Sequence, residues 1–141
     1  MLTIELVPRT AWYKNLRSEL SKEQWDELRR ASYKAAGYRC EICGGKGDKW
    51  PVEAHEIWEY DDKKHIQKLI GIISLCPLCH KVKHIGLAQM NGEYDIVLRH
   101  LAKVNGWDLE EAEDYINKQI NKWKDRSQYE WELNIDWLES V

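Results

Sequence analysis

The four cysteines of this sequence form two pairs, Cys40 with Cys43 and Cys76 with Cys79, and two residues separate the members of each pair. That spacing lets one tight turn direct two thiolates towards a single ion, and zinc prefers four such ligands in a tetrahedron. We therefore expect Cys40, Cys43, Cys76 and Cys79 to hold one structural zinc ion. The alternatives are a thioredoxin-like redox motif, for which two separate pairs would be unusual, or four unrelated thiols.

Histidines beside the second pair could bind another metal ion. Pro77 is a favoured first-turn residue, so a helix that begins there would place His80 and His84 four residues apart on one face. Two imidazoles at that spacing can bind one divalent ion. His55, at the end of a strand-like segment, could supply a third ligand.

These ligands require a strand that carries His55, a loop, a second strand, and the helix with His80 and His84, which together make a ββα unit. The 32 residues between Cys43 and Cys76 leave room for it, because a simple zinc ribbon has only about 15 to 20 residues there. Zinc at the cysteines would then clamp the two ends of a functional element.

Charge is distributed unevenly along the chain. The formal net charge is −3, but residues 1–100 carry 16 Lys and Arg against 14 Asp and Glu, whereas residues 101–141 carry 5 against 10. Residues 63–92 contain no acidic residue at all. A local positive patch attracts phosphates even on a mildly acidic protein. The candidate nucleic-acid-binding residues are therefore Lys63, Lys64, Lys68, Lys81 and Lys83.

Three segments taken together resemble HNH endonucleases of the zinc-stapled kind, over about residues 38–88. They are Cys40-x2-Cys43, Glu53-Ala54-His55-Glu56-Ile57, and Leu75-Cys76-Pro77-Leu78-Cys79-His80-x3-His84. The Trp-rich flanking segments and residues 58–62 look like a bacterial and phage branch of HNH-like zinc proteins, which would suggest a role in phage biology or bacterial defence.

The resemblance implies a ββα-metal (His-Me finger) core that hydrolyses DNA phosphodiester bonds with one divalent metal such as Mg, Mn, Ni or Zn. By the family's pattern, His55 is the first metal ligand, His80 is the catalytic and metal-binding residue that opens the helix, and His84 is a further ligand. Glu53 matches an acidic position that supports the site.

The sequence departs from the family's pattern at two positions. Glu56 stands where the general-base histidine should directly follow His55, and Gly71 stands where an asparagine orients that base. A carboxylate can act as the base if its pKa is raised, for example by nearby acids such as Glu53 and Glu59. Alternatively, Glu56 is a fourth metal ligand and His65 is the base, or the site binds metal and nucleic acid without cutting.

The expected fold class is α+β: the ββα-metal core clamped by the four-cysteine zinc site, with flanking helices and a short terminal β pairing. A chain of this length predicts one domain over residues 1–141, with an N-terminal strand and helix (1–37), the zinc core (38–88) and a helical extension with a C-terminal strand (93–141). Capping residues and periodicity predict helices over about 22–36, 94–104 and 109–125. Tyr129 to Trp137 alternates like a half-buried strand and could pair with Thr3 to Val7.

No apolar run approaches the roughly 18 residues that a membrane span needs, and residues 1–9 lack the features of a signal peptide. We therefore expect a cytoplasmic protein without a membrane partner.

Three functions remain open at this stage. The first is a metal-dependent HNH-type endonuclease that acts on DNA, with Glu56, His55 and His80 as catalytic residues. The alternative is a non-catalytic zinc-stapled module that binds nucleic acid or a protein. The third is an interaction protein that works through its acidic, Trp-rich C-terminal part, where tryptophans could also make a homodimer.

Overall fold

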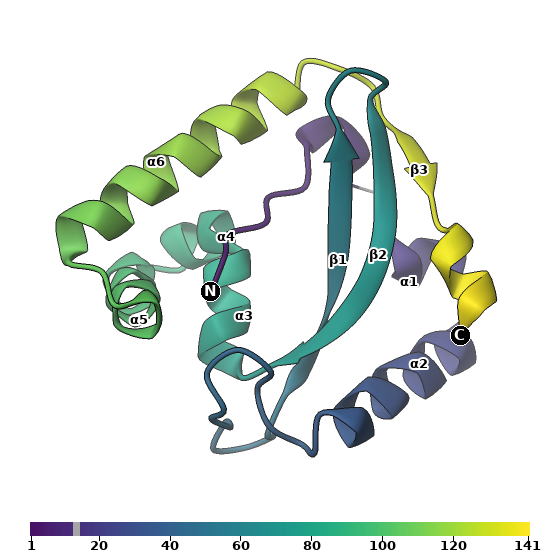
Figure 1. Cartoon of the computed structure of the whole chain (residues 1–141), viewed down its shortest axis with the longest axis horizontal. Helices are drawn as coiled ribbons and strands as arrows, with labels where there is room; N and C mark the ends of the chain where they lie inside the picture. The colour runs from purple at the N-terminus through teal and green to yellow at the C-terminus, as the bar shows by residue number, and fades with distance from the viewer. Residues whose placement is uncertain (13–14) are drawn as a thin grey trace.

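The computed structural model describes residues 1–12 and 15–141, and they form a mixed α+β fold (Figure 1). A long antiparallel hairpin stands at the centre, with helices on either side of it. In chain order the elements are η1 (Arg9–Ala11), α1 (Leu16–Glu19), α2 (Lys22–Ala35), β1 (Glu53–Asp61), β2 (Ile66–Leu75), α3 (Pro77–Lys83), α4 (Ile85–Met90), α5 (Tyr94–Asn105), α6 (Leu109–Arg126), β3 (Glu132–Asn134) and η2 (Asp136–Ser140).

The predicted order of strand, strand and helix is present as β1, β2 and α3. Pro77 is the first residue of α3, where its missing N–H costs nothing, and the Cys76 side chain accepts a hydrogen bond from the backbone N–H of Cys79. The helix ends at Lys83. His84 follows in a non-helical conformation, although its N–H still bonds to the carbonyl of His80.

A β-bulge in the hairpin decides which side chains face which core. Ile57 pairs with Gly71, but the next residue, Trp58, pairs with Leu69, so Ile70 is an extra residue in β2. Directly opposed residues in an antiparallel pair share a face, and one extra residue reverses the alternation of its strand. Odd-numbered residues of β2 therefore change sides at the bulge, so that Leu69 before it faces one core and Ile73 and Leu75 after it face the other.

The two cores lie on opposite sides of the hairpin. One contains Leu75 with buried residues of α3, α5 and α6. The other contains Leu69 and Trp58 with residues of α1, α2 and the C-terminal segment. Helices α3, α5 and α6 lie on the first side and α2 lies on the second, as Figure 1 shows. The buried cysteines Cys40, Cys76 and Cys79 belong to the first core.

The flanking helices follow the capping signals. Ser21 and Gln24 form a capping box at the start of α2, and Asp108 and Glu111 form another at the start of α6. Gly106, with φ +68°, ends α5 in the left-handed conformation that glycine adopts readily. The predicted helices agree with α2, α5 and α6 to within one or two residues.

The predicted terminal β pairing is wrong. The segment from Tyr129 to Trp137 forms only a three-residue strand, β3, which pairs in parallel with residues 66–68 of β2. Residues 2–8 form no strand, because side chains of α5 and α6 take up their backbone groups instead. Asn105 accepts from the Leu2 N–H at 2.7 Å, and the Tyr115 hydroxyl accepts from the Ile4 N–H at 3.1 Å.

Within residues 1–12 and 15–141, no helix has both the length and the apolar character needed to cross a bilayer.

Candidate functional site

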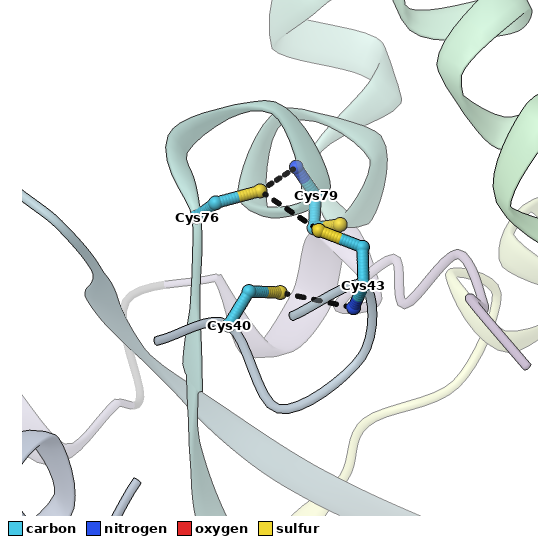
Figure 2. A group of neighbouring side chains, drawn as sticks. All are labelled: Cys40, Cys43, Cys76 and Cys79. Carbon is cyan, nitrogen blue, oxygen red and sulfur yellow. Dashed lines mark hydrogen bonds between the residues drawn. The ribbon is translucent and has the colours of Figure 1, made fainter. Parts of the chain in front are cut away.

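The four cysteines converge on one point from three parts of the chain (Figure 2). Cys40 and Cys43 lie in the loop after α2, Cys76 follows β2 as the N-cap residue of α3, and Cys79 lies in the first turn of α3. Their sulfur atoms all lie within 4.8 Å of one another, and Cys43 Sγ is 3.7 Å from Cys76 Sγ. Four thiols at these separations could hold a structural metal such as zinc.

Each cysteine pair is held by backbone N–H groups that donate to sulfur. The Cys43 N–H lies 3.5 Å from Cys40 Sγ, and the Cys79 N–H lies 3.4 Å from Cys76 Sγ. The Gly45 N–H lies 3.4 Å from Cys43 Sγ. Donors aimed at sulfur favour the thiolate, which is the form that binds a metal. The two-residue spacing provides these donors, because it places the N–H of the second cysteine of each pair against the sulfur of the first.

Without a cation, burial works against ionisation of Cys76 and Cys79. It raises the pKa of Cys76 to about 11, and it raises the pKa of Cys79 as well, helped by the negative charge of the neighbouring sulfurs. A metal ion compensates the desolvation and the mutual repulsion of thiolates. The donor set therefore fits a bound zinc ion.

Cys79 has a further partner that sequence reasoning missed. His100 Nε2 on α5 lies 3.1 Å from Cys79 Sγ, so a protonated Nε2 would donate to the thiolate. Contacts of this kind orient metal ligands and tune their basicity. The sequence favoured a packing or surface role for His100, because a position 21 residues after Cys79 carries no spacing signal.

The three predicted histidine ligands also come together. His55 lies on β1, His80 on α3, and His84 directly after α3. Their candidate ligand atoms all lie within 4.8 Å of one another, and the Nε2 atoms of His80 and His84 are 3.2 Å apart. This histidine cluster could hold one metal ion.

Two carboxylates orient the rings of the histidine cluster. Glu53 Oε1 lies 2.8 Å from His80 Nδ1, and its other oxygen accepts a hydrogen bond from Trp50 Nε1 at 2.8 Å. Glu5 Oε2 lies 3.0 Å from His55 Nε2. Carboxylates that hold the second nitrogen of a ligating histidine are typical of metal sites. Glu53 is one of the residues that the sequence analysis singled out, whereas no signal in the sequence pointed to Glu5.

The environment keeps two of these histidines neutral. Burial, followed by the nearby His80 and His55, lowers the pKa of His84 to about 4. Burial also lowers the pKa of His80, although Glu53 opposes the shift. Neutral imidazoles have a free lone pair, which metal coordination requires.

Glu56, the expected base, does not reach the cluster. Successive side chains of a strand point to opposite faces, so Glu56 faces away from its neighbour His55. Its carboxylate accepts hydrogen bonds from the Leu16 N–H and from Trp58 Nε1, both at 3.1 Å. Burial raises its pKa, as a base would need, but the carboxylate serves to anchor the first residue of α1.

The alternative base, His65, and the position that would orient a base, Gly71, do not contribute to the cluster either. His65 stacks on Tyr129, with ring centroids 4.2 Å apart, at the far turn of the hairpin. The strand from His55 to Asp61 alone spans about 20 Å. Gly71 pairs with Ile57 in the ladder and has no side chain to offer.

The lysine-rich stretch does not form one basic patch. Lys83 is buried, 3% exposed, and donates to Thr3 and Glu5. Lys81 forms an ion pair with Glu93 on the surface. The remaining three lie away from the histidine cluster, Lys63 and Lys64 in the far turn and Lys68 in β2 opposite Glu59. The expected role of Lys83 in binding phosphate is therefore wrong, because its side chain is buried. The other four lysines do not form one basic surface beside the histidine cluster.

Comparison with known proteins found no matching protein family, no matching curated protein and no matching solved structure.

Proposed function

We propose that this protein is a metal-dependent endonuclease of the HNH type, which hydrolyses DNA phosphodiester bonds at the histidine cluster. The observation that carries the proposal is the meeting of His55, His80 and His84 on a ββα unit, with their ligand atoms within 4.8 Å of one another. Three protein ligands leave one position of a tetrahedral ion open, which is typical of catalytic sites and not of structural ones.

The cysteine cluster and the histidine cluster have different roles in this proposal, one structural and one catalytic. The four cysteines join the loop after α2 to the end of β2 and the start of α3, and so fix the helix that carries His80. Glu53 and Glu5 then hold His80 and His55 in place. Ligands fixed by a second set of contacts keep the geometry that hydrolysis needs.

A divalent ion bound by these imidazoles would supply Lewis-acid chemistry, polarising a phosphoryl oxygen and lowering the pKa of water. Chemistry of that kind does not require a carboxylate base at position 56. The proposal therefore assigns ligand roles to His55, His80 and His84, positioning roles to Glu53 and Glu5, and no catalytic role to Glu56.

The test is nicking of supercoiled plasmid by protein whose histidine cluster has been stripped of metal and then given Mg, Mn, Ni or Zn. We expect metal-dependent nicking by the parent, loss to background in His80→Ala, and a parent-like rate in Glu56→Gln. The glutamine variant is the matched control because it keeps an oxygen acceptor for the Leu16 N–H. Nicking that survives His80→Ala, or is lost in Glu56→Gln, would contradict these roles.

The second candidate is a zinc-stapled module that binds nucleic acid or a protein without chemistry. The displacement of Glu56 and His65 from the cluster favours it, since both sequence-based bases are then unavailable. Its signature is salt-dependent DNA binding that His80→Ala leaves unchanged, together with no nicking under any metal.

A further inference from the structure

An open cavity of about 470 Å³ lies beside the histidine cluster, and His80 is the member of that cluster that lines it. The cavity is enclosed by α2 and by residues 50–54, which lead into β1. His80 and Glu53 form one wall, so the cavity adjoins the proposed active site at His80. Its other walls are largely aromatic, formed by Trp25, Tyr33, Tyr38 and Trp50.

Two of these rings are exposed to solvent. Tyr38 is 53% exposed and Trp50 is 50% exposed. Trp50 is held at its edge by the hydrogen bond from Nε1 to Glu53, which leaves the ring faces available. Rigid aromatic faces around a cavity are the usual means of binding flat, unpaired bases.

The backbone of Tyr38 adds a second observation. Its φ is +59°, a left-handed conformation that costs an L-residue roughly 1–2 kcal/mol. The preceding residue, Gly37, adopts a similar conformation at φ +65° without that cost. Strained conformations of this kind cluster at functional sites, where they place a particular side chain. Here the strain places an exposed tyrosine on the rim of the cavity.

Arginines supply the charge that a phosphate would require. Arg17 is exposed, lies 5.6 Å from the centre of the Trp25 ring, and takes part in none of the ion pairs among the described residues. It is close enough to His80 to add to the lowering of that residue's pKa, which burial dominates. Arg29, by contrast, is paired with Asp26 at 2.9 Å. Of the two arginines that line the cavity, Arg17 is therefore the one available to a phosphate.

We propose that this cavity binds an unpaired nucleotide of single-stranded DNA, with the adjoining phosphate near Arg17 and the histidine cluster. A base inside a duplex is covered on both faces by its neighbours, so it cannot stack on Trp50 or Tyr38. The volume lies within the range of about 300–1,000 Å³ for small-molecule sites, which suits one nucleotide and not a helix. The inference rests on the proposed function for the identity of the substrate, because it names the DNA structure that reaches that site.

The first test measures fluorescence anisotropy of a short labelled single strand and of the same sequence fully paired, without added divalent ions so that no cutting occurs. We expect the parent to bind the single strand more tightly than the duplex. Trp50→Ala and Tyr38→Ala should each weaken single-strand binding about tenfold, the usual loss for one stacked base. Tyr129→Ala, which removes an exposed ring at the far end of the hairpin, is the matched control and should bind like the parent.

The second test concerns Arg17. Arg17→Gln should reduce the slope of log affinity against log salt by about 0.7, the value for one phosphate contact in a single strand. Arg99→Gln, which removes an exposed arginine of α5 outside the cavity, should leave the slope unchanged.

Tyr38→Gly separates binding from folding. Glycine relieves the left-handed strain, so the melting temperature should not fall, whereas single-strand affinity should fall as in Tyr38→Ala. A parent-like affinity in Tyr38→Gly and Trp50→Ala would overturn the proposal, as would equal binding of duplex and single strand. Tighter binding of the corresponding RNA strand would overturn the assignment to DNA.

These outcomes are distinct from those that test the endonuclease. Cavity-dependent binding of the single strand without nicking would refute the proposed function and leave the binding site standing. Nicking with no effect of the cavity variants on binding would do the reverse.

Discussion

Replacing Cys79 by serine should prevent the chain from reaching its folded state. Cys79 is fully buried and shares the sulfur cluster with cysteines from two other parts of the chain. Structural zinc contributes about 10–16 kcal/mol to the folding of zinc-finger peptides, and an average domain is stable by only about 5–15 kcal/mol. We therefore expect loss of the bound metal, measured by metal analysis, and loss of the cooperative thermal transition, measured by circular dichroism. Exhaustive chelation should have the same result in the parent.

His84→Ala is the control for this effect. His84 belongs to the histidine cluster and not to the sulfur cluster, so its loss should leave one zinc per chain and a parent-like melting curve. A Cys79→Ser variant that melts like the parent would show that the sulfur cluster does not hold the fold together.

Replacing Glu5 by alanine should cost about 3–5 kcal/mol of stability, the usual penalty when one partner of a buried ion pair is removed. Glu5 bridges Lys83 Nζ at 3.1 Å and His55 Nε2 at 3.0 Å. Burial by itself raises the pKa of Glu5, but the hydrogen bond from His55 and the charge of Lys83 outweigh it, so the pKa lies below its ordinary value. The carboxylate is therefore ionised, and without it Lys83 would stay buried with no acidic partner among the described residues. Urea denaturation measures the loss.

A double variant distinguishes charge from packing. Methionine has a similar length to lysine and no charge, so Glu5→Ala combined with Lys83→Met should recover most of the lost stability. If the double variant is no more stable than Glu5→Ala, the penalty comes from lost packing of residues 2–8 and not from an unpaired ammonium group.

Features of this protein that depend on local spacing could be predicted from its amino-acid sequence. Two residues between paired cysteines set the geometry of each turn, and the N–H groups that donate to Cys40 and Cys76 follow from it. Pro77 and the capping boxes at Ser21 and Asp108 marked helix starts because their effects extend over only one turn. The order of strand, strand and helix was also predicted from the sequence, and it is present as β1, β2 and α3.

Which polar side chains reach the two clusters depends on long-range packing and could not be predicted from the sequence. Glu5 and His100 join the two clusters through contacts 50 and 21 residues away, which no local pattern encodes. Lys83 was expected on the surface. It is buried because the N-terminal segment lies against α3, where Thr3 accepts a hydrogen bond from Lys83, and does not pair with β3. Glu56 faces the second core because a strand sends adjacent side chains to opposite faces, and only the packing of two cores shows which face holds the histidines.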